Sequence, residues 1–181
     1  MSILKDIKNR LRGGVNVDKL VQRGLVLGKN CHLGSAFIDP SHCFHISIGD
    51  NVTFGPGVTV LAHDASTHTF LGYTRVADVK IGSNVFIGAR SIVLPGVTIG
   101  DNVVVGAGSI VSRDLPSGSV AVGAPARVVK ELTAFLEAKK GEMRKENTFG
   151  EEHTLRNADF SESQREALLR ATKDYGCLYI E

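Results

Sequence analysis

Residues 81–116 read IGSNVF IGARSI VLPGVT IGDNVV VGAGSI VSRDLP, and an aliphatic residue opens each block of six. These residues are Ile81, Ile87, Val93, Ile99, Val105 and Val111. A period of six fits neither an α-helix, with a period near 3.6, nor an amphipathic strand, with a period near 2. It is typical of short strands separated by turns and wound into coils, with the aliphatic residues pointing inward. The stretch therefore predicts an all-β parallel β-helix in which three blocks make one coil.

The remaining positions of the repeat support this interpretation. Glycine follows the aliphatic residue in four blocks, as expected at a sharp corner where the backbone is crowded or φ is positive. In the first five blocks, the position four after the aliphatic residue is small or β-branched: Val85, Ser91, Val97, Val103 and Ser109. Asx and Ser pairs that favour turns occur at 50–51, 83–84 and 101–102. Residues one coil apart should stack at about 4.8 Å, namely Ile81 on Ile99, Ile87 on Val105 and Val93 on Val111.

An earlier array has the same repeat but loses phase twice. Its inward residues are Leu27, Leu33, Ile48, Phe54 and Val60. Fifteen residues separate Leu33 from Ile48, around Asp39-Pro40, and twenty-one separate Val60 from Ile81. A break in phase marks a place where the chain leaves the coil, so we expect an irregular loop at 61–80.

The flanking segments predict helices that cover the open ends of the coils. Amphipathic patterns at 2–12 and at 127–146 indicate two of them. A third is expected near 162–173, because Ser161 and Gln164 have the spacing of a capping box. We therefore expect an N-terminal helical cap, a β-helix catalytic domain and a C-terminal helical extension, at 1–23, 24–126 and 127–181.

Composition and charge narrow the class of protein. Glycine makes up 20 of 181 residues, above the average share of about 7%, and tryptophan is absent, so the core must be aliphatic. A net charge of +2 is too small to indicate nucleic acid as a partner. No segment has the roughly 20 apolar residues of a membrane span, so no membrane insertion is expected. Three cysteines without a CxxC pair (Cys31, Cys43 and Cys177) are typical of free thiols in the cytoplasm.

His63 differs from the other five histidines because it lies three residues after Val60, where the regular coil becomes a loop. Imidazole titrates near neutral pH, so it can remove a proton from a hydroxyl or amine that attacks a thioester. Asp64 is adjacent, and adjacent residues on extended backbone point apart, so a more distant carboxylate is expected to orient the ring. The alternative is an ordinary loop histidine. Cys31 fits core packing better than nucleophilic chemistry, and no GxSxG, Walker or GxGxxG motif is present.

Four motifs carry a resemblance to a known family: HD at 63–64, IGSNVFIGARSIVLPGVTIG at 81–100, VVGAGSIVSRDLP at 104–116 and VAVGAPARVVK at 120–130. Together they make 48–130 resemble the galactoside, maltose and xenobiotic acetyltransferase branch of the hexapeptide acyltransferases. The resemblance implies a left-handed β-helix and a homotrimer with active sites between subunits. It also implies acetyl-CoA as co-substrate and direct transfer to the acceptor.

The resemblance also implies roles for individual residues. The catalytic histidine of the family falls on His63. The CoA-contacting positions fall on Phe86, Ala89, Ala107, Ser112, Arg113, Arg127 and Lys130. Small residues such as Ala89 and Ala107 let the flat pantetheine arm lie against the coil, and the cations suit the phosphates of CoA. The alternative for Arg127 and Lys130 is that they are solvated charges on a helix.

One departure from the family pattern bears on the acceptor. Galactoside and maltose enzymes have proline after the histidine, whereas this chain has Asp64, which resembles acetyltransferases that modify capsule, lipopolysaccharide or exopolysaccharide sugars. The loop that follows should shape the acceptor site through Asp64, Tyr73 and Arg75. We therefore expect a CoA-dependent O-acetyltransferase that acts on a hydroxyl of a sugar or polysaccharide precursor. An N-acetyltransferase acting on a nucleotide-linked amino sugar is the alternative.

Two other functions fit the same repeat less well. A γ-class carbonic anhydrase needs three histidines on one metal ion. His63 and His68 have a suggestive spacing, but Ala89 stands where that family has a histidine, so no metal is expected. A non-catalytic binding module would have no affinity for CoA.

Overall fold

The computed structural model describes residues 16–155 and 157–181. The helix predicted at 2–12 lies outside these residues. The chain divides into two compact units, one ending at Thr133 and the other comprising Ala134–Glu181. Each unit is described separately below.

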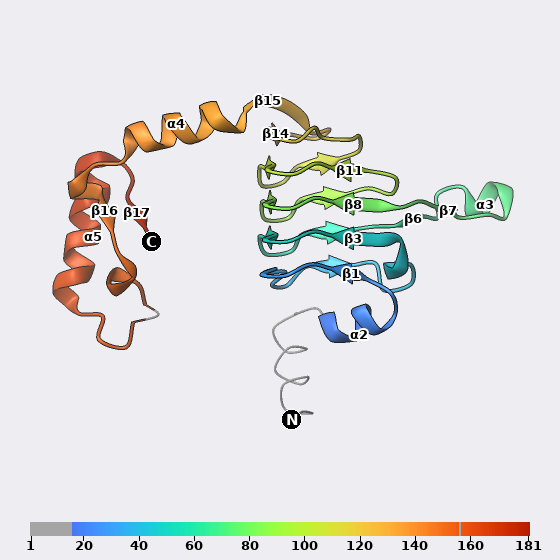
Figure 1. The fold of residues 1–181 in the computed structure, drawn as a ribbon, viewed down its shortest axis with the longest axis horizontal. Helices are drawn as coiled ribbons and strands as arrows, with labels where there is room; N and C mark the ends of the chain where they lie inside the picture. Colours follow the sequence, from blue (N-terminus) through green and yellow to red (C-terminus); the bar gives the residue numbers. More distant parts are fainter. Residues whose placement is uncertain (1–15, 156) are drawn as a thin grey trace. The chain divides into compact units, whose positions relative to one another are not determined.

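Three sheets form the stacked coils of the first unit, and the chain visits them in turn (Figure 1). Face 1 consists of β1 (Val26–Leu27), β3 (Ile46–Ile48), β8 (Val79–Ile81) and β11 (Thr98–Ile99). Face 2 consists of β4 (Thr53–Phe54), β9 (Phe86–Ile87), β12 (Val104–Val105), β14 (Ser119–Val122) and β15 (Arg127–Glu131). Face 3 consists of β2 (Phe37–Ile38), β5 (Thr59–Val60), β10 (Ile92–Val93) and β13 (Ile110–Val111).

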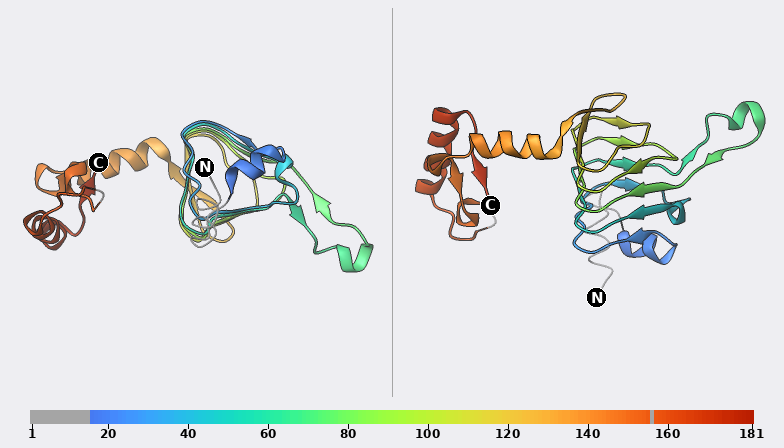
Figure 2. Two further views of the ribbon diagram at one scale, coloured as in Figure 1. Left: turned by 90° about the horizontal axis from the view of Figure 1, so that it is seen from below. Right: turned by 45° about the horizontal axis from the view of Figure 1, so that its top comes forward.

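The strands within each face are parallel, except for β14 and β15, and the predicted register is confirmed. Ile81 pairs with Ile99, Ile87 with Val105, and Val93 with Val111. Viewed along the stack, the coils superpose on one another (Figure 2, left). The residues four positions further on are buried as well: Val85, Ser91, Val97, Val103 and Ser109. Each block of six therefore contributes two inward side chains, and nearly all of them are aliphatic.

Of the two reasons expected for glycine at the corners, crowding of the backbone is confirmed and positive φ is wrong. Gly82, Gly88, Gly100 and Gly106 do not have positive φ; a Cβ there would collide with the adjacent coil. Positive φ falls instead on asparagine, at Asn51 (56°), Asn84 (57°) and Asn102 (56°). The amide of Asn51 donates to Asn84 at 3.0 Å, and that of Asn84 donates to Asn102 at 3.1 Å. Asparagine tolerates the left-handed region, and this ladder connects successive coils.

The chain leaves the coils at both predicted breaks. After β2, residues 39–45 form an excursion that includes the 3-10 helix η1 (Cys43–His45). After β5, a hairpin formed by β6 (His63–Asp64), α3 (His68–Leu71) and β7 (Arg75–Val76) projects from the stack (Figure 2). Its strands pair antiparallel, with His63 opposite Val76 and Asp64 opposite Arg75. The irregular loop predicted at 61–80 is therefore an ordered hairpin.

Helices and one added strand flank the coils. Helix α2 (Val17–Gln22) lies beside the first coil and buries Leu20 against the core (Figure 1). The helix predicted at 127–146 is wrong at its start, because residues 127–131 form β15 and α4 (Leu132–Glu142) begins only afterwards. The β-branched pair Val128 and Val129 favours a strand, and pairing with β14 satisfies an otherwise open sheet edge.

The second unit contains the predicted third helix. Helix α5 (Glu162–Tyr175) begins with the capping box of Ser161 and Gln164. It is accompanied by the 3-10 helices η2 (Lys145–Asn147) and η3 (Glu151–His153) and by the parallel pair β16 (Thr148–Phe149) and β17 (Tyr179–Ile180). Within the described ranges, no helix is both long and apolar enough to cross a bilayer.

Substitution of Gly88 by alanine tests the close stacking of the coils. Its Cβ would lie 2.4 Å from the backbone nitrogen of Ala107 in the adjacent coil. Overpacking of this kind costs about 1–3 kcal/mol, so we expect a clear drop in the free energy of unfolding measured with urea. Gly141→Ala is the control, because a Cβ there meets nothing within 4 Å. Equal stability of the two variants would contradict this explanation of the glycines.

Candidate active site

His63 and a buried carboxylate meet at one corner of the first unit. Strands β2 and β5 pair in parallel with Ile38 beside Val60, so the residues that follow them emerge at the same place. Asp39 comes directly after β2, and His63 comes three residues after β5. Nδ1 of His63 is hydrogen-bonded to Oδ2 of Asp39, whose side chain is 0% exposed whereas that of His63 is 34% exposed. The distant carboxylate expected from the sequence is therefore Asp39.

Asp39 is held by the backbone on both of its oxygens. Oδ1 accepts hydrogen bonds from the amides of Ser41 (3.0 Å) and His42 (3.3 Å), and Oδ2 accepts one from Ala62 (3.2 Å). Burial raises the pKa of the Asp39 carboxyl. The hydrogen bonds from His63, Ser41 and Ala62 outweigh that effect, and the pKa lies below its ordinary value. The carboxylate is thus ionised at neutral pH and accepts the Nδ1 proton of His63, which leaves Nε2 of the neutral ring unprotonated.

Asp64 does not take part in this pair. Its side chain is exposed and accepts a hydrogen bond from the amide of Ser66 at 2.8 Å. That bond is the main reason why the pKa of the Asp64 carboxyl lies below its ordinary value. Asp64 therefore stabilises the turn after β6, and its carboxylate remains accessible to an acceptor.

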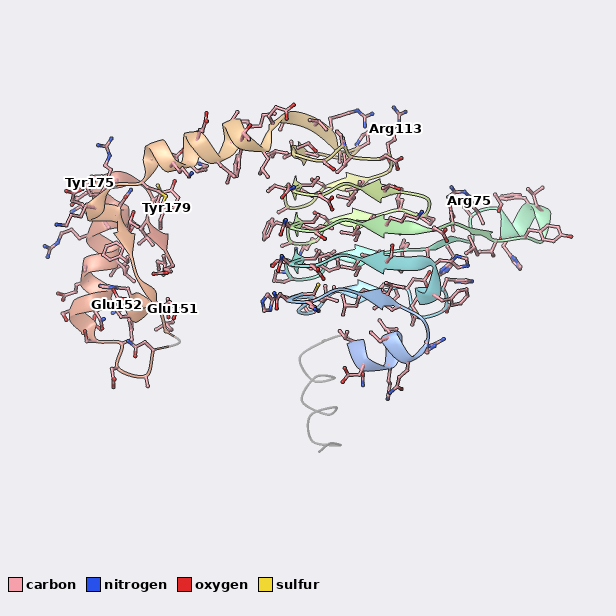
Figure 3. All side chains as sticks on the ribbon, viewed as in Figure 1. Arg75, Arg113, Glu151, Glu152, Tyr175 and Tyr179 are labelled. Atoms are coloured by element: carbon pink, nitrogen blue, oxygen red, sulfur yellow. The ribbon has the colours of Figure 1, made fainter. Side chains whose placement is uncertain are left out.

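A cavity of about 480 Å³ lies beside the His63–Asp39 pair. It is lined by Leu61, His63, Asp64, Ala65, Arg75, Leu94, Pro95 and Ser112. Arg75 lies at the base of the hairpin (Figure 3) and donates from Nη1 to the carbonyl of Pro95 at 3.1 Å. The structure thus brings together His63, two of the three predicted acceptor residues and one predicted CoA residue. A larger hollow of about 700 Å³ in the second unit is lined by none of the predicted site residues.

Tyr73 is the predicted acceptor residue that does not line this cavity. It lies between α3 and β7 near the tip of the hairpin, and its side chain is among the most exposed large hydrophobic groups, at 77%. Phe70 and Leu71 beside it are exposed at 84% and 67%. Within one chain, the hairpin tip therefore contributes nothing to the pocket at His63.

Most of the predicted CoA residues lie along face 2. Phe86 is on β9 and 45% exposed, and Arg127 and Lys130 are on β15, so these two cations belong to a strand and not to a helix. Ala89 and Ala107 follow β9 and β12 and lie on neighbouring coils, because the amide of Gly108 donates to the carbonyl of Ala89 at 2.8 Å.

Ser112 and Arg113 follow β13 on face 3, as His63 follows β5 on the same face. Arg113 lies nearer the β14 end of the stack than Arg75 (Figure 3). The predicted donor residues are therefore divided between two faces of one chain, and only Ser112 lines the cavity of His63.

Sequence reasoning did not identify Asp39 or His42 as site residues. The signal that could have found them was the first break in phase, at Asp39-Pro40. Asp39, His42 and His63 each offer one metal-binding atom, and these atoms lie within 4.8 Å of one another. Among the described residues they are the only such cluster of three.

Comparison with known proteins identifies the family of the chain. A family model described as the hexapeptide repeat of succinyl-transferase matches residues 78–113. Protein CapG of Staphylococcus aureus is 39% identical over 131 residues, which make up 69% of this chain and 76% of CapG. The galactoside O-acetyltransferase of Escherichia coli K12 is 41% identical over 113 residues, and the chain spans only 56% of that enzyme.

Among solved structures, a maltose O-acetyltransferase from Clostridium difficile 630 is 31% identical and has a TM-score of 0.52. The match covers 70% of this chain and 83% of that enzyme. The resemblance inferred from the motifs is confirmed, and a non-catalytic module is excluded. The chain belongs to the hexapeptide-repeat acetyltransferase family, and it is an acetyltransferase.

Proposed function

We propose that the chain transfers the acetyl group of acetyl-CoA to a hydroxyl of a sugar or polysaccharide precursor, with His63 as general base. The observation that carries this proposal is the hydrogen bond between His63 and buried Asp39 at the edge of a 480 Å³ cavity. A buried carboxylate fixes one imidazole tautomer and leaves Nε2 free to accept a proton. This arrangement suits an acceptor that must lose a proton as it attacks.

His63 acts twice in the proposed reaction. Nε2 removes the hydroxyl proton while the acceptor oxygen bonds to the thioester carbonyl carbon. The carbon–sulfur bond then breaks, and the protonated ring returns that proton to the departing sulfur of CoA. Between these steps the ring is an imidazolium ion, which the ionised Asp39 stabilises electrostatically. The products are an acetyl ester and free CoA, and His63 ends in its starting state.

The division of the donor residues over two faces supports a site shared between subunits. The His63 cavity is on face 3, whereas Phe86, Arg127 and Lys130 are on face 2. We infer a homotrimer in which face 2 of one copy completes the cavity of another, and coils wound left-handed, as the resemblance implies. Sedimentation velocity measures the assembly state, and a monomer that is fully active would contradict this part of the proposal.

The cavity carries groups suited to a saccharide. Asp64 is an exposed hydrogen-bond acceptor, and Arg75 supplies donors on the opposite strand of the hairpin. Sugar hydroxyls bind to such mixed sets of donors and acceptors. The three cysteines are free thiols, which supports a proposed location in the cytoplasm, where acetyl-CoA is available.

Release of free thiol from acetyl-CoA tests the function directly. The purified protein is incubated with simple sugars, nucleotide-linked sugars and short oligosaccharides. We expect thiol release with a hydroxyl acceptor and an acetylated product that mild alkali cleaves, as it cleaves esters. A product that resists alkali would be an amide and would identify an amino sugar as acceptor. The proposal fails if calorimetry shows no binding of CoA or acetyl-CoA at millimolar concentration.

The double variant Arg127→Ala and Lys130→Ala tests the donor side. Each hydrogen bond to a charged group contributes about 1.5–3 kcal/mol, or at least about tenfold. Loss of both contacts should therefore raise the KM for acetyl-CoA by at least about 100-fold, with little change in kcat. Lys80→Ala is the matched control, because Lys80 is an exposed cation on face 1. An unchanged donor KM in the double variant would show that these charges do not contact CoA.

A further inference from the structure

We propose that Asp39, His42 and His63 form a zinc-binding site, and that zinc bound there blocks acetyl transfer. Each residue offers one ligand atom, and these atoms lie within 4.8 Å of one another. Oδ2 of Asp39 is near Nδ1 of both histidines. Zinc binding itself is independent of the proposed function, whereas its inhibitory effect rests on His63 as the base.

The position of His42 carries the proposal. Its Nδ1 is buried and, among the described residues, is the only buried side-chain nitrogen or oxygen without a hydrogen-bond partner. It lies 3.7 Å from Oδ2 of Asp39, too far for a hydrogen bond. Leaving a buried polar atom unpaired is costly, so the site gains from a ligand that this nitrogen can bind.

The spacing of the three atoms suits a metal ion. Zinc binds nitrogen and oxygen at about 2.0–2.2 Å, so tetrahedral ligand atoms lie about 3.3 Å apart. The separation of 3.7 Å between His42 and Asp39 is close to this value. The hydrogen bond between His63 and Asp39 has to open to admit the ion. The two rings already lie side by side, with centroids 4.9 Å apart.

The chemistry of the ligands selects the metal. Two imidazole nitrogens and one carboxylate suit zinc and neighbouring transition metals, whereas calcium and magnesium require oxygen ligands. A carboxylate and neutral imidazoles are the forms of these side chains that bind zinc. The backbone holds the carboxylate through Ser41, His42 and Ala62, which restricts its movement.

Zinc at this position would remove the base. In the free protein, Nδ1 of His63 carries the proton and Nε2 is the acceptor. Zinc takes the lone pair at Nδ1, so the ring proton moves to Nε2, and the neutral ring then has no nitrogen free to accept a proton. The ion also takes the Asp39 carboxylate that would stabilise an imidazolium. Zinc therefore inhibits by occupying both the base and the carboxylate that holds it.

Calorimetric titration of the metal-free, untagged full chain with zinc chloride tests binding without reference to activity. We expect one zinc ion per chain. When Co²⁺ is used in place of zinc, its visible absorption spectrum should be that of an ion with a low coordination number. His42→Ala should weaken zinc binding by at least about tenfold. His42→Gln is the second variant, because it retains side-chain volume and removes the imidazole ligand. Circular dichroism establishes that both variants are folded.

His45→Ala is the matched control. Its Nδ1 lies 2.7 Å from a carboxylate oxygen of Asp78, so it forms a histidine–carboxylate pair like that of the site. Among the described residues, this pair has no third ligand. The control should bind zinc as the unmodified protein does. Absence of binding at millimolar zinc, or binding that neither His42 variant weakens, would overturn the proposal.

Inhibition is measured in the thiol-release assay. Zinc should inhibit the unmodified protein at the concentrations at which it binds, and EDTA should restore the rate. For His42→Gln, the zinc concentration that halves the variant's own uninhibited rate should be at least about tenfold higher. Zinc binding in a protein that acetylates no acceptor would contradict the proposed function and leave the metal site supported. Acetyl transfer without zinc binding would overturn only the metal site.

Discussion

His63→Ala is expected to lower kcat by about 10²–10⁴-fold, the contribution typical of a general base. The acceptor hydroxyl then has to lose its proton to water or to Asp64, which also lines the cavity, and a carboxylate is a much weaker base than imidazole. The KM for acetyl-CoA should change little, because the donor residues predicted on face 2 do not include this side chain. Steady-state kinetics at saturating acetyl-CoA measures both constants.

The variant should remain folded. The side chain of His63 is 34% exposed, and after its removal Asp39 keeps three hydrogen bonds from backbone amides. His68→Ala is the control, since His68 lies on the exposed helix α3 and does not line the cavity. Near-normal turnover of a folded His63→Ala variant would remove His63 from the proposed role.

The regular part of the fold could be predicted because its physics is local and repeats. Ile81, Ile87 and Val93 each pair with the residue 18 positions later, as the period of six requires. The pairing of these successive coils follows from the repeat itself and does not require contacts with segments outside it. The exit of the chain before His63 was visible for the same reason, since any departure from a strict period is conspicuous.

The partner of His63 could not be named because it depends on the breaks in that period. Asp39 reaches His63 only because Ile38 pairs with Val60, and Ile38 follows Leu33 after five residues and not six. After the excursion at 39–45 the repeat of six resumes at Ile48, fifteen residues after Leu33. A periodic pattern predicts the register of unbroken coils but does not show how an insertion is accommodated.

The strand β15 was missed for a different reason. Its amphipathic pattern also fits a helix, and the open edge of β14 decides in favour of the strand. That edge is a feature of the assembled coils and is not encoded in the segment 127–131. The predicted charges Arg127 and Lys130 are therefore presented from a strand of the same face as Phe86, and β14 and β12 lie between them.

Asp39→Asn is expected to lower kcat by about 10²–10⁴-fold, because the amide reverses the tautomer of His63. One side of the carboxylate accepts from the amides of Ser41 and His42, and the other accepts from Ala62 and His63. An asparagine NH₂ on the first side would face two N–H donors, so it should turn to the second. There it donates to Nδ1 of His63, the ring proton moves to Nε2, and the base is lost.

The pH dependence of the free energy of unfolding of Asp39→Asn distinguishes the effect of the Asp39 charge from that of its packing. The pKa of Asp39 is lowered in the folded protein, so its ionisation stabilises the fold fully above the unfolded pKa of about 3.9. This contribution is lost as the pH falls through the folded value. Asp39→Asn should therefore be less stable in urea by about 1–3 kcal/mol at neutral pH, with a smaller difference in acid. A difference independent of pH, or unchanged kcat in the variant, would contradict the role of the ionised carboxylate in holding His63.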